Sequence, residues 1–174
     1  MLTAIIESLR QVEKNVELTV LSGNPEDTAA KHQVCSVYRF NPLGIIRTMK
    51  DSELIISGGG SLLQDVTSKR SLLYYLSIIG LGKFFGKKVM LFAQGIGPIR
   101  AKWARKLTSL VCNEADLITV RDSESAAELI EMGVKPEKIT VTADSVLSLN
   151  PVTKECWCRF NQARHRYFCT SLVW

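Results

Sequence analysis

Residues 53–65, ELIISGGGSLLQD, decide the fold of this 174-residue chain. The apolar run 53–57 leads directly into the glycine triplet Gly58, Gly59 and Gly60. A short, continuous apolar run that ends at a turn signal is typical of a strand buried on both faces of a parallel sheet. We therefore expect a buried strand whose carboxyl end opens into a glycine-rich loop.

Two further stretches repeat this arrangement of an apolar strand followed by a polar turn. The strand predicted at 88–93 is followed by Gln-Gly-Ile-Gly-Pro at 94–98, and the strand at 117–120 is followed by Arg121 and Asp122. Helical periodicity separates the strands, which indicates βα units and a parallel, Rossmann-like α/β sheet. The other predicted strands are 16–21, 34–38 and 139–142, and the predicted helices are 2–12, 42–50, 71–85, 101–114 and 123–132.

The two ends of the sequence depart from this alternation. A helical pattern follows Met1 at once, so we expect a sheet that lacks the strand with which a doubly wound domain usually begins. After Pro151 the alternation stops, and Cys, Trp, Arg and His gather in residues 156–174. We expect residues 1–155 to form the domain. Residues 156–174 are interpreted as an anomalous tail, either disordered or translated from an altered reading frame, and a genuine, poorly ordered terminus is the milder alternative.

The charge and composition exclude several classes of protein. With 46% hydrophobic and 22% charged residues, the chain is neither disordered nor fibrous. The formal net charge is +5, of which the three arginines of the tail supply three, leaving about +2 for the body. A body so near neutrality gives no reason to expect a nucleic-acid partner. The five cysteines suit reduced thiols in a cytoplasmic protein, and no spacing typical of metal ligands is present.

One segment raises the alternative of contact with a membrane surface. Phe84 and Phe85 stand beside Gly86, Lys87 and Lys88, so apolar bulk adjoins basic charge. A core helix explains the same apolar run without a membrane, and contact at the inner face of the cell membrane is the minority interpretation.

The carboxyl ends of the predicted strands supply the candidate binding residues, because ligands of parallel α/β sheets collect there. In the first loop, glycines let backbone amides approach an anionic or sugar ligand. In the second, Gln94 offers its amide to a ligand hydroxyl, although a tight strand-to-helix connection explains the same residues. The candidates in these two loops are Gly58, Gly59, Gly60, Ser61, Gln64, Asp65, Gln94, Gly95 and Gly97.

Arg121 is the candidate for holding a negatively charged ligand. It lies at a strand end directly before a helix, where a guanidinium and backbone amides together suit a carboxylate or phosphate. The alternative is an ion pair with Asp122 or Glu124. Asp144, after the last predicted strand, is either an acidic ligand or the cap of a turn.

Taken in order, these loops resemble the polysaccharide pyruvyl transferase family. The resemblance rests on four motifs, SGGGSLLQD at 57–65, QGIGP at 94–98, RDSES at 121–125 and TAD at 142–144, and extends to about residue 155. It is strongest to the bacterial CsaB-type members, which modify secondary cell-wall polymers. The resemblance implies one half of a two-domain architecture similar to that of glycosyltransferase-B enzymes.

The resemblance also implies a reaction. Phosphoenolpyruvate would be the donor substrate, no cofactor would be needed, and a lipid-linked cell-wall saccharide would accept the pyruvyl group as a ketal that anchors S-layer proteins in some bacteria. Arg121 would bind the donor, and the glycine loop would line the cleft. Family members usually continue into a second half with further basic residues, so we expect this chain to be an incomplete, inactive copy. The alternatives are a fragment of a nucleotide-sugar-dependent glycosyltransferase and a non-catalytic remnant that only binds ligands.

Overall fold

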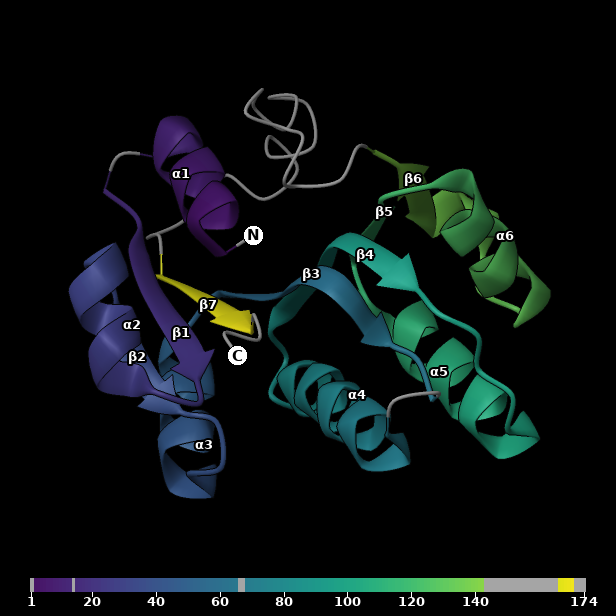
Figure 1. The fold of residues 1–174 in the computed structure, drawn as a ribbon, viewed down its shortest axis with the longest axis horizontal. Coiled ribbons are helices and arrows are strands. Elements are labelled where there is room, and N and C mark those ends of the chain that lie inside the picture. The colour runs from purple at the N-terminus through teal and green to yellow at the C-terminus, as the bar shows by residue number, and fades with distance from the viewer. Residues whose placement is uncertain (1, 14, 66–67, 143–165, 171–174) are drawn as a thin grey trace.

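The computed structural model describes residues 2–13, 15–65, 68–142 and 166–170 (Figure 1). No helix within these residues is both long enough and apolar enough to cross a bilayer. The described helices are α1 (Leu2–Val12), α2 (Pro25–His32), α3 (Pro42–Asp51), α4 (Lys69–Phe84), α5 (Lys102–Glu114), α6 (Ser123–Glu131) and the 3-10 turn η1 (Pro136–Lys138). The described strands are β1 (Glu17–Ser22), β2 (Cys35–Tyr38), β3 (Leu54–Leu63), β4 (Lys88–Ile96), β5 (Leu117–Val120), β6 (Ile139–Val141) and β7 (Arg166–Thr170).

The described strands form one parallel sheet in the order β2-β1-β7-β3-β4-β5-β6. This arrangement confirms the expected α/β class with a Rossmann-like parallel sheet. β7 lies between β1 and β3, with Thr19 and Ile55 both opposite Phe168 (Figure 1). It therefore fills the position that the first strand takes in the doubly wound order 3-2-1-4-5-6.

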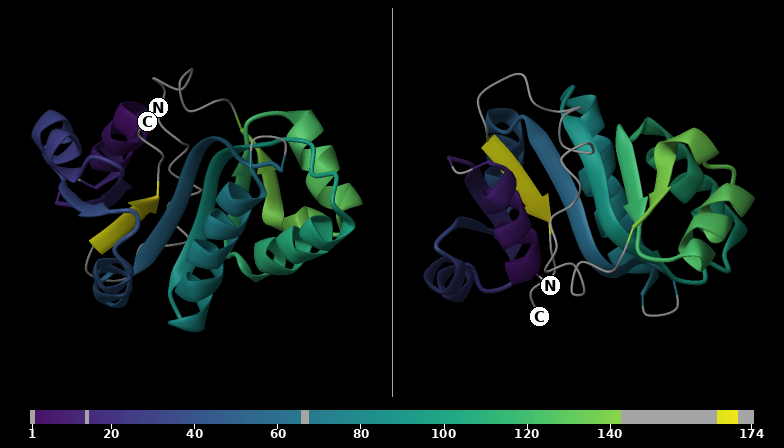
Figure 2. Two further views of the ribbon diagram at one scale, coloured as in Figure 1. Left: turned by 60° about the horizontal axis from the view of Figure 1, so that its bottom comes forward. Right: turned by 90° about the horizontal axis from the view of Figure 1, so that it is seen from above.

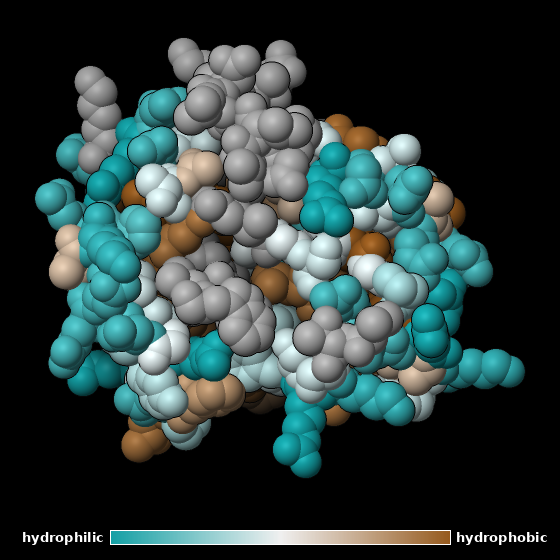
Figure 3. Space-filling view, in the orientation of Figure 1, coloured by the Kyte–Doolittle hydropathy of each residue, from teal (hydrophilic) through white to brown (hydrophobic). Residues whose placement is uncertain are grey.

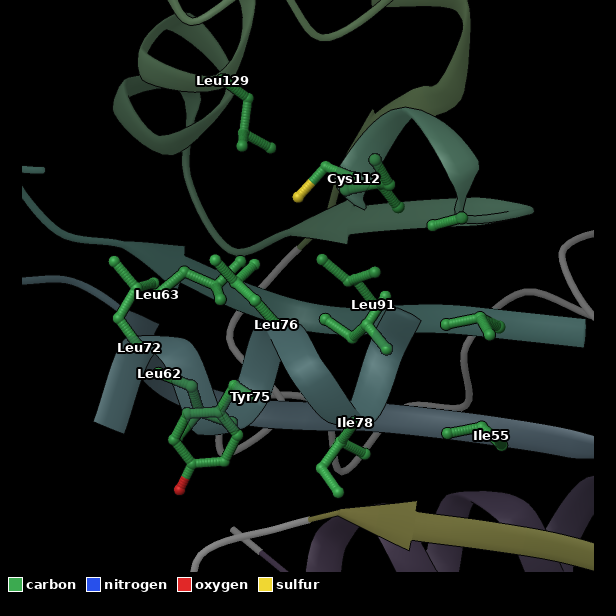
Figure 4. Packing of buried hydrophobic residues seen from close by; sticks show 14 of the residues in the cluster. Ile55, Leu62, Leu63, Leu72, Tyr75, Leu76, Ile78, Leu91, Cys112 and Leu129 are labelled. Carbon is green, nitrogen blue, oxygen red and sulfur yellow. The ribbon is translucent and has the colours of Figure 1, made fainter. Parts of the chain in front are cut away.

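Two hydrophobic clusters lie on the two faces of the sheet (Figure 2). Consecutive residues of β3 alternate between them: Leu54 and Ile56 contact the cluster formed with α1, and Ile55 contacts the cluster formed with α3, α4, α5 and α6. Figure 4 shows the second cluster, in which Leu72 and Leu76 of α4 pack toward the sheet. Burial on both faces explains why the strands read as continuous apolar runs rather than as alternating ones.

Local signals in the sequence predicted several elements and their ends correctly. α3 begins at Pro42, as expected, and the side chain of its N-cap Asn41 accepts a hydrogen bond from Gly44 N. Gly133 follows α6 with a φ of +93°, a conformation that favours glycine. The N-cap of α6 is Asp122 rather than the expected Ser123, because the Asp122 carboxylate accepts the hydrogen bond from Ser125 N.

The structure corrects the prediction that Gly58, Gly59 and Gly60 form a loop after a short strand. The glycines are part of β3, which continues to Leu63. Gly58 pairs with Phe92, and a Cβ at Gly58 would lie 3.0 Å from Ile5 Cδ1, so this glycine permits the close approach of α1. Gly60 has a φ of +77° at a shift in the register with β4, which makes it a bulge residue.

Apart from the short turn η1, two described elements were not predicted at all. Residues 25–32 form α2, whose only strong signal is Asn24 followed by Pro25, a pair that also suits a turn. β7 arises within residues 156–174, for which no regular element was expected. A five-residue strand that pairs on both sides gains its stability from β1 and β3, and such partners leave no local mark in the sequence.

Candidate functional site

The three loops selected from the sequence meet at the carboxyl edge of β3, β4 and β5. Gly95 of β4 is buried, and a Cβ added to it would lie 2.6 Å from Arg121 Cζ and 2.9 Å from Ser61 Oγ. The Arg121 guanidinium and the Ser61 hydroxyl therefore both lie against the bare backbone of Gly95. Glycine at this position allows one side chain from the first loop and one from the third to meet over the second.

Arg121 is held by its neighbours on β4 and α6. Its backbone N–H donates to Gln94 O over 3.1 Å, and its Nε donates to Asp122 Oδ2 over 3.0 Å. The ion pair with Asp122 that the sequence left open is thus present. The remaining guanidinium nitrogens make no hydrogen bond to the residues that the structure describes, and the side chain is 37% exposed. Arg121 can therefore accept an anionic ligand without breaking its bond to Asp122.

Asp122 connects this arginine to the start of α6. Its Oδ1 accepts a hydrogen bond of 2.6 Å from Ser125 N. That bond, a second one from the Ser125 hydroxyl and the neighbouring Arg121 lower the pKa of Asp122 below its usual value. Asp122 is consequently ionised at neutral pH. Ser125 Oγ in turn accepts from Ile96 N over 3.0 Å, so the second and third loops are joined directly.

Gln94 is placed differently from the expectation that its amide faces a ligand. The side chain is completely buried, and Nε2 donates to Ser57 O over 2.9 Å. It therefore ties β4 to β3. Gln94 Oε1 and Ser57 Oγ have no hydrogen-bond partner among the described residues.

A bulge in β4 sets the direction of Gln94. Ala93 has a φ of +45°, and the register with β5 shifts between Leu91 and Gln94. The buried Thr119 hydroxyl accepts from Ala93 N over 2.7 Å and donates to Leu91 O over 3.2 Å. Thr119 thus satisfies the backbone groups that the bulge removes from the ladder. Bulges of this kind occur next to functional sites, where they change the direction of a side chain.

Gln64 and Asp65 lie farther along the same edge. A Cβ at Gly97 would come within 2.6 Å of Gln64 Cβ, so these two residues pack closely, much as Arg121 packs on Gly95. Asp65 Oδ2 accepts from Arg100 N over 2.9 Å and from Ala101 N over 3.0 Å, at the start of α5. A cavity of about 430 Å³ lies here, lined by Asp65, Lys69, Arg100 and Ala101.

Two other candidates lie apart from this cluster or outside the described residues. Gly58 packs against Ile5 and Phe92, away from the Arg121 cluster. Asp144 lies outside the described residues. Among the residues that are described, no three or more His, Cys, Asp or Glu side chains are grouped so as to hold a metal ion.

Sequence reasoning missed the basic and aromatic residues near the start of α4. Lys69 and Arg70 occupy its first turn, which has no acidic residue, and the N-cap Ser68 makes no side-chain hydrogen bond to the helix. Acidic residues usually occupy this end, because the helix dipole disfavours cations there. The two adjacent cations at the start of a predicted helix are the signal in the sequence that could have identified these residues.

The fold and the site together define a Rossmann-like domain with a partly exposed arginine at the carboxyl edge of its parallel sheet. The family model of polysaccharide pyruvyl transferase matches residues 1–160, and the chain belongs to this family. Enzymes of this family transfer a pyruvyl group to a polysaccharide. No curated protein and no solved structure matches the chain at a significant level.

Proposed function

We propose that this domain binds phosphoenolpyruvate and serves the transfer of its pyruvyl group to a sugar of a cell-wall polysaccharide. The observation that carries the proposal is the Arg121 guanidinium, fixed over Gly95 by Asp122 and still able to donate further hydrogen bonds. Phosphoenolpyruvate carries a carboxylate and a phosphate, and a guanidinium can hold either through two parallel hydrogen bonds.

The proposed reaction forms a ketal between the donor and two hydroxyls of one sugar. A general acid protonates the methylene carbon of the enol, and one sugar hydroxyl adds to the neighbouring carbon and returns a proton to the conjugate base of that acid. The bond from that carbon to the phosphate oxygen breaks, the second hydroxyl adds in its place, and its proton goes to the departing phosphate. Arg121 would stabilise the negative charge of the carboxylate or of the departing phosphate.

Binding of the donor by this chain tests the proposal. Calorimetry should detect phosphoenolpyruvate binding to the chain, and Arg121→Ala should weaken it by about 10-fold to 100-fold, the value of one or two charged hydrogen bonds. Arg121→Lys should weaken it less, because the charge is kept and the paired geometry is lost. Tighter binding of a UDP-sugar than of phosphoenolpyruvate would instead favour a glycosyltransferase.

Turnover separates an enzyme from a binding remnant. Release of inorganic phosphate should be measured with phosphoenolpyruvate and a lipid-linked cell-wall saccharide, both with this chain and with a version that carries the second half typical of the family. We propose that only the extended version turns over. Release of phosphate by this chain alone would contradict that proposal. If both versions bound phosphoenolpyruvate and neither released phosphate, the result would support a non-catalytic remnant that only binds ligands.

We also propose that the acceptor is presented at the inner face of the cell membrane. Phe84, at the end of α4, is 81% exposed and is followed within four residues by Phe85, Lys87 and Lys88. It precedes the amino end of β4, opposite the edge that bears Arg121.

In the space-filling view, hydrophilic side chains cover much of the outline of the visible face, and apolar ones form separate groups (Figure 3).

A further inference from the structure

A second cavity lies at the carboxyl end of β2, away from Arg121. Its volume is about 350 Å³, within the range of small-ligand sites. The connection from β2 to α3 contributes Arg39 and Phe40, and α4 contributes its N-cap Ser68 together with Arg70, Tyr74 and Tyr75. These residues belong to none of the motifs on which the family resemblance rests.

The walls of this cavity are fixed in place by contacts within the protein. Tyr74 Oη donates to Arg39 O over 2.9 Å, and Arg39 N donates to Ser22 O over 2.9 Å. The Phe40 and Tyr74 rings make an edge contact with centroids 5.9 Å apart, and Tyr74 contacts Tyr75 in the same way at 5.3 Å. Burial raises the pKa of both tyrosines, so their hydroxyls stay neutral, and Tyr74 uses its proton in the bond to Arg39 O. The site is therefore largely formed before any ligand arrives.

The chemistry of the lining combines an open aromatic surface with positive charge. Phe40 is 60% exposed, although it belongs to a cluster of aromatic rings, and the Arg39 guanidinium lies 5.0 Å from its centroid. Arg70 lies in the first turn of α4, where the helix dipole already favours an anion and disfavours the cation that is present. An apolar ring face suits the carbon–hydrogen face of a sugar, and the guanidiniums suit a phosphate.

We propose that this cavity binds a phosphorylated saccharide, with the sugar ring on Phe40 and the phosphate on Arg70. The proposal rests on the proposed function and deepens it, since the cavity would hold part of the acceptor. The cavity lies between the end of β2 and the start of α4, which follows β3, and β3 and β2 are two and five strand spacings from β5, about 10 and 24 Å. The bound phosphate would therefore belong to a part of the acceptor that is separate from the reacting sugar.

Binding measurements on the full chain test this assignment. The probes are glucose 1-phosphate, N-acetylglucosamine 1-phosphate, the two free sugars and inorganic phosphate, each followed by calorimetry and by the NMR signals of the aromatic rings. We expect at least one sugar phosphate to bind at least 10-fold more tightly than its free sugar and than inorganic phosphate. Phe40→Ser and Arg70→Ala should each weaken that binding at least 10-fold.

Matched controls separate this site from the donor site. Phe84→Ser removes a phenylalanine that is even more exposed than Phe40, and Lys106→Ala removes an exposed cation of α5; both variants should bind the sugar phosphate like the parent chain. Phe40→Ser and Arg70→Ala should leave phosphoenolpyruvate binding unchanged. Arg121→Ala should weaken phosphoenolpyruvate binding and leave sugar-phosphate binding unchanged. If sugar-phosphate binding failed while phosphoenolpyruvate still bound, the acceptor assignment alone would be overturned.

Three other results would also overturn the assignment. One is sugar-phosphate binding that survives both Phe40→Ser and Arg70→Ala. Another is inorganic phosphate binding as tightly as the sugar phosphates, because the ring would then contribute nothing. The third is uridine or adenosine monophosphate binding more tightly than the sugar phosphates with the same dependence on Phe40, which would identify a nucleotide base on the ring.

Discussion

The guanidinium of Arg121 lies against the backbone of Gly95, and a methyl group on that glycine would approach Arg121 Cζ to 2.6 Å. The same methyl group would lie 2.9 Å from Ser61 Oγ. The position of the arginine therefore depends on the absence of a side chain at residue 95. This relationship connects a glycine of the second loop to the charge of the third.

Gly95→Ala should displace Arg121 and weaken phosphoenolpyruvate binding. We expect a loss of about 10-fold or more, similar to the loss in Arg121→Ala, because the guanidinium can no longer lie over residue 95. Gly80→Ala is the matched control, since a Cβ at Gly80 of α4 meets nothing within 4 Å. Calorimetric titration of both variants is the measurement, and parent-like affinity in Gly95→Ala would show that the donor does not need this arrangement.

Gly82→Ala should destabilise the fold, although the substitution is usually favourable in a helix. A Cβ at Gly82 would lie 2.5 Å from Ile55 Cδ1 and 3.1 Å from Val89 Cγ2, and both of those residues are fully buried. We expect a loss of about 1–3 kcal/mol from overpacking. Gly80→Ala, two residues earlier, should instead stabilise by up to about 1 kcal/mol. Urea unfolding measures the change in the free energy of unfolding for both variants. If both changes had the same sign, the close packing of α4 on the sheet would be contradicted.

Asp122 should contribute stability that depends on pH. The pKa of the Asp122 carboxyl is lower in the folded protein than in the unfolded chain. Asp122 therefore adds to the free energy of unfolding at a pH above its unfolded-state pKa, and this stability is lost as the pH falls through its folded-state pKa. Asp122→Asn keeps an N-cap acceptor but removes the charge, and its deficit relative to the parent should shrink on acidification. Asp122→Ala also removes the cap, at a cost of about 1 kcal/mol. Unfolding curves at neutral and acidic pH test this, and a deficit of Asp122→Asn that is constant with pH would refute it.

Ending the chain after residue 155 should destabilise the sheet. β1 and β3 would both lose β7, including the pairings of Val20 and Ile56 with Cys169. We expect the free energy of unfolding to fall by at least about 3 kcal/mol, given the number of hydrogen bonds lost along two strand edges. A synthetic peptide of residues 164–171 added in excess should restore part of it. Identical thermal unfolding of the full and shortened chains would show that β7 adds nothing to stability.

Phe84→Ser should reduce binding to lipid vesicles. Phe84 is 81% exposed and adjoins basic residues, so vesicles that contain anionic lipid should retain the parent chain more than neutral vesicles do. Leu43→Ser, which removes a side chain that is 79% exposed on α3, is the control. Co-sedimentation measures both. Equal sedimentation of the parent chain and Phe84→Ser would leave the proposed membrane contact without support.

Much of the fold could be read from local patterns, because these patterns describe interactions between near neighbours. The apolar runs of β3, β4 and β5 indicated buried parallel strands, and Asn41 with Pro42 marked the start of α3. Arg121 was recognised as a candidate for the same reason, since a strand end followed by a helix start is visible in sequence. The family assignment also followed from ordered motifs, and the match over residues 1–160 confirms it.

Other features required contacts between distant segments. Gly58 and Gly60 were predicted to lie in a loop. Only the close packing of Ile5 on Gly58 and the bulge at Gly60 opposite β4 explain why both belong to a strand. Gln94 was predicted to offer its amide to a ligand, and only the structure shows that its Nε2 donates to Ser57 O and so joins two strands. The aromatic cavity unites Phe40 with Tyr74, which are far apart in the chain.

The sequence by itself thus determined the alternation of strands and helices, the direction of the sheet, the family and the arginine at the strand end. These depend on residue type and spacing over a few turns of chain. The tertiary structure alone decided that β7 enters the middle of the sheet, that Arg121 rests on Gly95 and that Phe40 and Arg70 border one cavity. The physical reason is that these arrangements arise from packing and strand pairing between residues that are remote in sequence. A local sequence pattern does not depend on the free energy of such contacts and therefore cannot predict them.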